Sequence, residues 1–105
     1  MNKRLIAALL AAPLAAWLAP AQANPEEAMT KAGCMACHAK DKKMVGPSFQ
    51  QIAAKYKGQD AKATLVQKVR TGGKGNFGPI PMAPNPPEKI NDADLKSAVE
   101  FILKS

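Results

Sequence analysis

The chain has 105 residues, a formal charge of +7 at pH 7, 5% aromatic residues and two cysteines. A chain of this length forms one small domain, which excludes a barrel enzyme or a two-domain enzyme. Two cysteines exclude a disulfide-dense scaffold. A zinc site on Cys34, Cys37 and His38 would lack a fourth strong ligand, because the sequence contains no other cysteine or histidine.

The first 23 residues have the pattern of a secretory signal peptide. Lys3 and Arg4 precede an apolar run at 5–18, and small residues before Asn24 predict cleavage after Ala23. A retained membrane anchor is the alternative, but the run is shorter than the roughly 20 residues needed to span a bilayer. Loss of Lys3 and Arg4 lowers the formal charge from +7 to +5 and leaves a single domain at 24–105, with no stable membrane insertion.

Four stretches of the mature chain have apolar residues at helical spacing, with capping or terminating residues at their ends. None shows the alternation of a β-strand, so the sequence predicts an all-α fold. The expected helices run from Pro25 to about Ala32, from Ser48 to Gly58, from a cap at Asp60 to about Gly72, and from Asn91 or Asp92 through Ile102.

A loop rich in glycine and proline separates the third and fourth predicted helices, from Gly72 to Lys89. A flexible linker is the simplest interpretation, but only one helix follows it. Long loops in small domains usually have a function, and proline stiffens the backbone. We therefore expect this loop to hold one side chain in place.

Cys34, Cys37 and His38 form the C-x-x-C-H arrangement of covalent haem attachment. Two thiols at this spacing can each add to one vinyl group of the same porphyrin, and the next residue brings an imidazole under the iron. The alternatives are a local disulfide or a thioredoxin-like dithiol, which expects a βαβ context that this sequence lacks. Because bacteria attach haem c outside the cytoplasmic membrane, the motif and the signal peptide together predict a periplasmic protein with one haem c.

Met82 is the expected sixth ligand of the haem iron. The sequence has no second histidine, Met35 lies inside the attachment motif, and Met44 follows His38 too closely to reach the opposite face of the haem. Met29 lies on the first predicted helix, where a methionine usually packs in the core, whereas Met82 lies in the stiff loop. His/Met ligation raises the reduction potential and closes the iron to substrates, which favours one-electron transfer.

Three motifs, at 33–39, at 43–47 and at 78–82 with Asn85, resemble those of class I c-type cytochromes. The chain is most similar to the short bacterial electron carriers of the cytochrome c-five-fifty-one type, over residues 24–105. The resemblance implies four or five helices around one covalent haem, with the first and last helices crossing.

The resemblance also implies a role for individual residues. Cys34 and Cys37 would form the thioethers, and His38 and Met82 would be the axial iron ligands. The carbonyl of Pro47 would accept the second ring N–H of His38, which fixes the tautomer and the basicity of the imidazole.

Asn85 would, by the same resemblance, donate toward the Met82 sulfur and tune the potential. Lys68 stands where an arginine often contacts a haem propionate, and a lysine offers a point charge instead of a planar fork. Phe77 and Phe101 stand where these cytochromes commonly have tryptophan. The Phe77 position therefore lacks an indole N–H for a propionate.

The resemblance implies a monomeric electron carrier rather than an enzyme. It would carry electrons from a membrane quinol-oxidising complex to a nitrite reductase, terminal oxidase or peroxidase. Its spread lysines would steer acidic redox partners, although such charges are often only a solvated face. Nucleic acid is not an expected partner of an exported protein. The alternative function, an open-site haem enzyme or gas-binding sensor, needs a free iron position, and Met82 argues against it.

Overall fold

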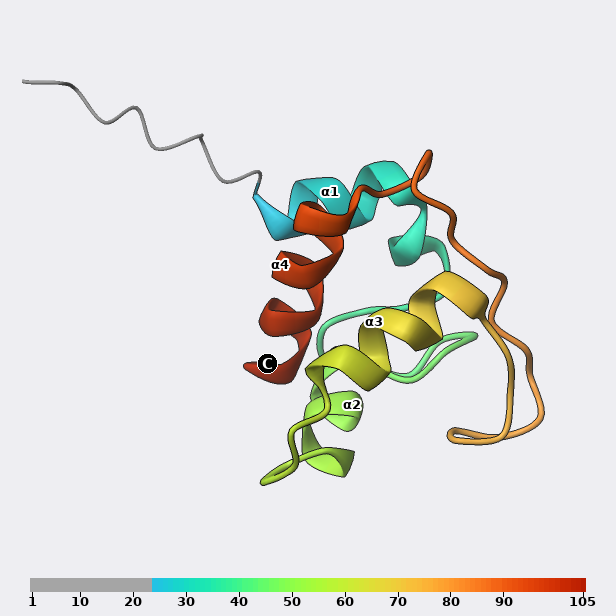
Figure 1. Cartoon of the computed structure of the whole chain (residues 1–105). Helices are drawn as coiled ribbons and strands as arrows, with labels where there is room; N and C mark the ends of the chain where they lie inside the picture. The colour runs from blue at the N-terminus through green and yellow to red at the C-terminus, as the bar shows by residue number, and fades with distance from the viewer. Residues whose placement is uncertain (1–23) are drawn as a thin grey trace, which may run out of the picture.

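The computed structural model describes residues 24–105, so the signal peptide and the cleavage site expected at 1–23 lie outside the described residues. Within 24–105 the only strand-like pairing is an isolated bridge between Gly73 and Met82, which confirms the predicted all-α fold. No helix in this part of the chain is long and apolar enough to cross a membrane. The elements, in order, are α1 (Pro25–Ala32), the short 3₁₀ helix η1 (Cys34–Ala36), α2 (Phe49–Lys55), α3 (Lys62–Thr71) and α4 (Asp92–Leu103) (Figure 1).

Side-chain caps begin three of the helices where the sequence predicts them. The Asn24 side chain accepts the Glu26 backbone N–H at 3.0 Å before α1. Ser48 and Gln51 form a reciprocal capping box before α2, and Asn91 accepts the Asp94 N–H before α4. Such caps satisfy backbone N–H groups that the first helical turn leaves unpaired.

The predicted cap at Asp60 is wrong. The residue before α3 is Ala61, which makes no side-chain cap hydrogen bond. Ala61 is only 4% exposed, so burial of its methyl group in the domain holds this end of the helix. Asp60, one position before Ala61, is exposed and lies outside the first turn of the helix.

Helix α4 contacts α1, α2 and α3, and its buried face is the centre of the core (Figure 1). Met29 of α1 is 1% exposed, which confirms that it is a core residue. The hydrophobic cluster consists of Ala28, Met29, Ala32, Phe49, Ile52, Ile90, Leu95, Ala98 and Val99.

An exposed ion pair between Lys62 and Glu100 joins the start of α3 to α4. The hydrogen bond from Lys62 lowers the pKa of the Glu100 carboxyl below its ordinary value. A carboxyl with a lowered folded-state pKa stabilises the fold above its unfolded pKa, and this contribution is lost as pH falls through the folded pKa.

Replacement of Glu100 by glutamine is therefore expected to cause a small loss of stability at neutral pH. The loss should disappear well below the ordinary glutamate pKa of about 4.3. Because both side chains are nearly half exposed, high salt should also reduce it. Guanidinium is itself a salt, so urea unfolding at several pH values is the measurement. A difference that persists in acid would contradict the assignment.

Candidate haem site

The segment that carries both cysteines starts at the left-handed Gly33, which ends α1 at φ +86°. The chain then makes the turn η1, in which the His38 N–H donates to the Cys34 carbonyl at 3.0 Å. Both thiols are free, with Cys34 half-buried and Cys37 exposed. Burial raises the pKa of the Cys34 thiol. The turn thus places two unpaired thiols immediately before the only histidine.

Three groups fix the orientation of the His38 ring. Its Nδ1 lies 2.7 Å from the Pro47 carbonyl oxygen, so Nδ1 carries the proton and Nε2 keeps its lone pair. The Phe49 ring stacks on the imidazole, with centroids 5.9 Å apart and planes 23° apart. Gly46 lies against the ring, and its N–H donates to the Cys37 carbonyl at 2.7 Å. The Pro47 contact is the one that the family resemblance implies, whereas no pattern in the sequence indicates the packing of Gly46 and Phe49 on His38.

Gly46→Ala is expected to push the His38 ring out of position. A methyl group at residue 46 would lie 2.5 Å from Cε1 and 2.9 Å from Nδ1 of His38. Overpacking of this kind costs about 1–3 kcal/mol, and it would strain the hydrogen bond to Pro47. Guanidinium unfolding and the reduction potential should both change. Val45→Ala in the same loop, at a residue 53% exposed, is the control; equal effects in the two variants would contradict this role of Gly46.

Met82 is partly buried and is held by backbone pairing to the residues that follow α3. The Gly73 N–H donates to the Met82 carbonyl at 3.0 Å, and the Met82 N–H donates to the Gly73 carbonyl at 2.9 Å. The remainder of the loop is irregular, as the glycines and prolines predict. A β-strand is predicted from apolar and polar residues that alternate over several positions. This bridge pairs only two single residues, nine positions apart, so no such pattern marks it in the sequence.

Asn85 and Lys68 both lie close to this backbone bridge. The Asn85 Nδ2 donates to the Ala83 carbonyl at 3.1 Å and lies 3.4 Å from the Val69 carbonyl oxygen. The Lys68 ammonium lies over Gly73, 3.0 Å from where a Cβ atom on that residue would stand. The expected contacts of Asn85 with sulfur and of Lys68 with a propionate stay predictions.

Phe77 is 39% exposed and packs under the ammonium of Lys55, 4.4 Å from the ring centroid. Lys55 also donates to the carbonyl of Asn76. These contacts tie α2 to the outer part of the loop, and a cation over an aromatic face adds roughly 0.5–1 kcal/mol at an exposed site.

The donor set fits a covalently held haem. The thiols are free to form thioethers, the imidazole presents Nε2, and a thioether comes from a separate loop. Leu65, Val66 and Val69 of α3 are partly buried apolar side chains, of the kind that a porphyrin face needs beside it. Across residues 24–105, no three His, Cys, Asp or Glu side chains gather as a direct metal site.

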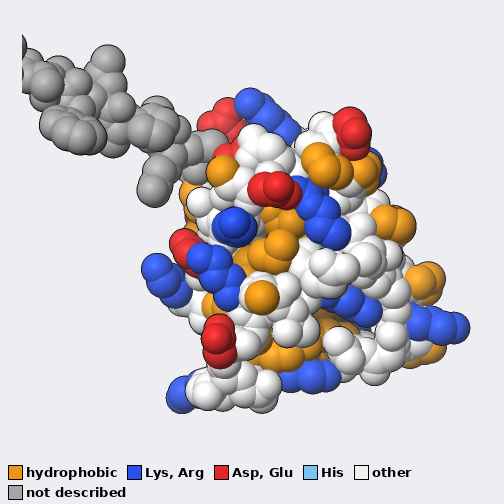
Figure 2. Space-filling view, viewed as in Figure 1, with side chains coloured by type: hydrophobic (Ala, Val, Ile, Leu, Met, Phe, Trp, Pro, Cys, Tyr) orange, Lys and Arg blue, Asp and Glu red, His pale blue; other side chains and the backbone are white. Residues whose placement is uncertain are grey.

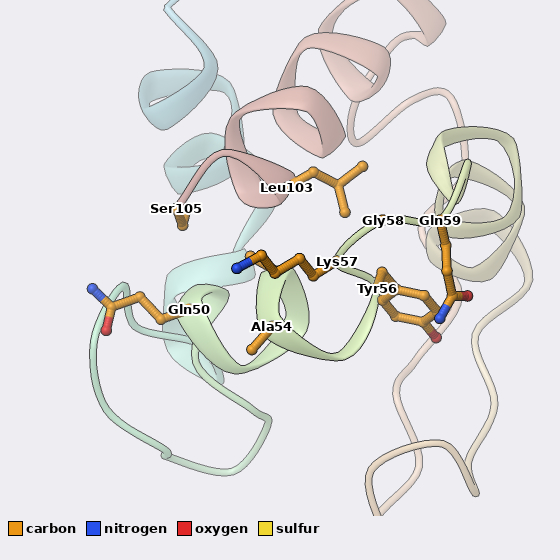
Figure 3. A pocket seen from close by; sticks show the side chains of 9 residues that line it. Gln50, Ala54, Tyr56, Lys57, Gly58, Gln59, Leu103 and Ser105 are labelled. Carbon is orange, nitrogen blue, oxygen red and sulfur yellow. The ribbon is translucent and has the colours of Figure 1, made fainter.

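An open hollow of about 440 Å³ lies elsewhere, between α2 with its following turn and the end of α4 (Figure 3). Its lining includes Tyr56, Lys57 and Leu103, and none of the four expected haem-binding residues. The hollow is therefore separate from the candidate haem site.

An all-α domain whose chain carries C-x-x-C-H in a turn defines a covalent haem protein, and comparison with known proteins identifies the family. The family model for cytochrome c matches residues 22–105. The chain belongs to the cytochrome c family.

Several relatives support this assignment over most of their length. Cytochrome c2 of Rubrivivax gelatinosus is 52% identical over 84 residues, which is 79% of this chain and 99% of the relative. Cytochrome c-551 of Azotobacter vinelandii is 48% identical over 79 residues, 74% of this chain and 93% of the relative. The crystal structure of Nitrosomonas europaea cytochrome c552 matches with a TM-score of 0.68 at 40% identity, covering 75% of this chain and 96% of that one.

Membership of the family confirms several predictions from the sequence. The chain is a short class I cytochrome that carries covalently bound haem c with its iron. It is a small electron carrier and not an enzyme, like the cytochromes that it resembles.

Proposed function

We propose that the chain is a periplasmic one-electron carrier, with haem thioethers at Cys34 and Cys37 and axial ligands His38 and Met82. The observation that carries this proposal is the 2.7 Å hydrogen bond between His38 Nδ1 and the Pro47 carbonyl. It leaves Nε2 as the ring nitrogen available to a metal, directly after the two free thiols.

The bound haem supplies an iron that cycles between Fe(II) and Fe(III). The protein's part is to hold two ligands in one geometry for both oxidation states. Phe49, 1% exposed, backs the imidazole, and the bridge to Gly73 fixes the backbone of Met82. A thioether ligand favours the reduced iron and leaves no position for a substrate. Little rearrangement is then needed when an electron enters or leaves.

The spectrum of the ferric protein tests this ligation. We expect low-spin, six-coordinate iron with a thioether-to-iron charge-transfer band, and haem that stays on the polypeptide after acid–acetone extraction. High-spin iron that readily binds small ligands would instead support an open-site haem enzyme or gas-binding sensor.

Acidic redox proteins are the proposed partners, a membrane quinol-oxidising complex as donor and a terminal reductase such as nitrite reductase, an oxidase or a peroxidase as acceptor. We propose that cleavage after Ala23 leaves a mature monomer. On the face shown in Figure 2, Lys and Arg side chains are interspersed with fewer acidic side chains. The exposed lysines include Lys40, Lys42, Lys43, Lys55, Lys57 and Lys74. Electron-transfer rates with such partners should fall as salt rises, and rates insensitive to salt would contradict steering.

A further inference from the structure

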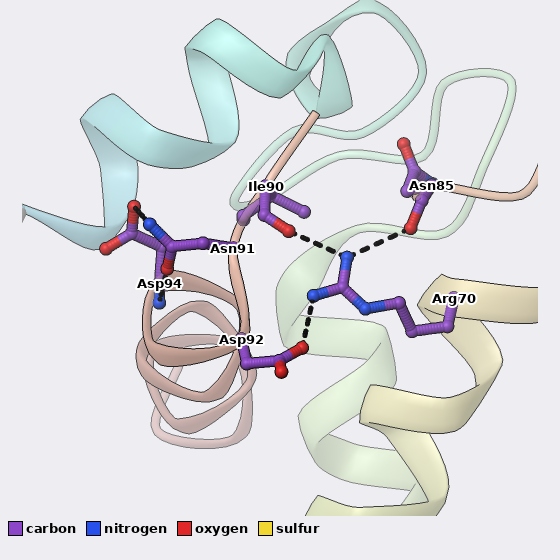
Figure 4. A network of polar contacts seen from close by, with 6 residues as sticks. All are labelled: Arg70, Asn85, Ile90, Asn91, Asp92 and Asp94. Carbon is purple, nitrogen blue, oxygen red and sulfur yellow. Dashed lines mark hydrogen bonds and ion pairs between the residues drawn. The ribbon is translucent and has the colours of Figure 1, made fainter. Parts of the chain in front are cut away.

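Arg70, in the last turn of α3, joins three parts of the fold through one guanidinium group (Figure 4). Its Nη1 donates to the Asn85 carbonyl at 3.1 Å and to the Ile90 carbonyl at 2.7 Å. Its Nη2 donates to Asp92 Oδ1 at 2.7 Å, in the first turn of α4. Arg70 therefore contacts the loop after Met82 and the start of α4 at the same time.

The Arg70 side chain is only 15% exposed, whereas its carboxylate partner Asp92 is 80% exposed. An exposed ion pair contributes little to stability, so the two backbone carbonyls are the more important partners of the partly buried guanidinium. Hydrogen bonds that involve a charged group are about twice as strong as neutral ones, and loss of one partner leaves buried polar groups unsatisfied.

The same end of α3 holds the loop through its backbone. The Asn85 N–H donates to the Val69 carbonyl at 3.0 Å, next to Arg70 in the chain. Met82 itself is paired through its backbone with Gly73, just beyond α3. The loop is thus attached to one helix end at Met82 and again three residues later at Asn85, and Arg70 reinforces the second attachment.

We propose that Arg70 is a positioning residue for Met82. By holding the Asn85 backbone, Arg70 keeps the Met82 thioether on the iron. This inference rests on the proposed function, because it needs Met82 as an iron ligand. Loss of the Arg70 hydrogen bonds would free the segment C-terminal to Met82 and favour a state in which the sulfur has left the iron.

Displacement of Met82 by imidazole measures that equilibrium in the ferric holoprotein. Arg70→Gln should raise the apparent affinity for imidazole roughly tenfold or more, the factor expected for loss of one or two charged hydrogen bonds. Arg70→Lys, which keeps the charge but not the planar fork, should show a smaller increase and remains informative if the glutamine variant folds poorly. Asp92→Asn leaves both carbonyl contacts and should have little effect.

Lys62→Gln is the matched control, because Lys62 also links α3 to α4, through Glu100 at the other end of the helix. Global stability of each variant is measured by guanidinium unfolding. The proposal is supported if only the Arg70 variants bind imidazole more tightly than their stability loss explains. It is overturned if, in the Arg70 variants and in Lys62→Gln alike, the rise in imidazole affinity is no larger than the loss of global stability explains. If the unmutated protein lacks the thioether band, the proposed ligation fails; an unmutated protein with the band and unchanged affinity in Arg70→Gln overturns this inference alone.

Discussion

Met82→Ala is expected to abolish the thioether charge-transfer band and convert the ferric iron from low spin to a high-spin or water-ligated form. The backbone bridge to Gly73 does not involve the Met82 side chain, so the loop should keep its path while losing the sulfur. The reduction potential should fall by an amount on the order of 0.1 V, within the range of about 0.8 V that axial ligands set. Absorption spectra and a redox titration of the purified protein measure both effects.

Met44→Ala is the control for this substitution, because Met44 is 41% exposed in the loop that precedes Pro47. We expect its spectrum and potential to match those of the unmutated protein. Loss of the band in Met44→Ala and its retention in Met82→Ala would show that Met44, and not Met82, supplies the thioether.

Gly72→Ala is the second substitution with a large expected effect. Gly72 ends α3 with φ +70° and ψ −159°, a backbone region that is essentially restricted to glycine. An added Cβ would also overlap the Met82 carbonyl oxygen and lie 2.9 Å from the Pro84 nitrogen. Strain costs about 1–3 kcal/mol and overpacking a similar amount, so we expect a loss of roughly 2–6 kcal/mol.

The neighbours that Gly72→Ala would displace are backbone atoms of the Met82 loop, so weaker Met82 ligation should accompany the loss of stability. Gly58→Ala separates strain from collision, since Gly58 has φ +76° and nothing lies within 4 Å of an added Cβ. That control should cost about 1–2 kcal/mol and leave imidazole affinity unchanged. Equal stability losses in the two variants would show that the collision at Gly72 is relieved elsewhere.

The sequence predicted the helices because their signals are local. Asn24, Ser48 and Asn91 each stand directly before a helix and satisfy its first backbone N–H groups. The attachment motif is equally local, since C-x-x-C-H is a contiguous pattern. The start of α3 escaped prediction because Ala61 is fixed by tertiary burial, and a side-chain pattern cannot express that.

Contacts between distant segments were largely inaccessible from the sequence. Gly46 reads as an ordinary loop glycine, and only the fold shows His38 beside it. Arg70 reads as one basic residue in the last turn of a helix, because its partners at Asn85 and Ile90 are backbone carbonyls that carry no sequence signal. The Pro47 contact was anticipated through family resemblance, since a carbonyl acceptor has no signature of its own.

The attachments of the Met82 loop have a consequence for how the surface of this protein can vary. The bridge from Gly73 to Met82 and the bond from Asn85 to Val69 use backbone groups on the loop. Side chains between the two ends of the bridge, such as the exposed Lys74 and Ile80, can therefore change without moving the Met82 backbone. With the proposed Met82 ligation, substitutions on the surface of this short loop are therefore expected to change the choice of redox partner while the reduction potential is preserved.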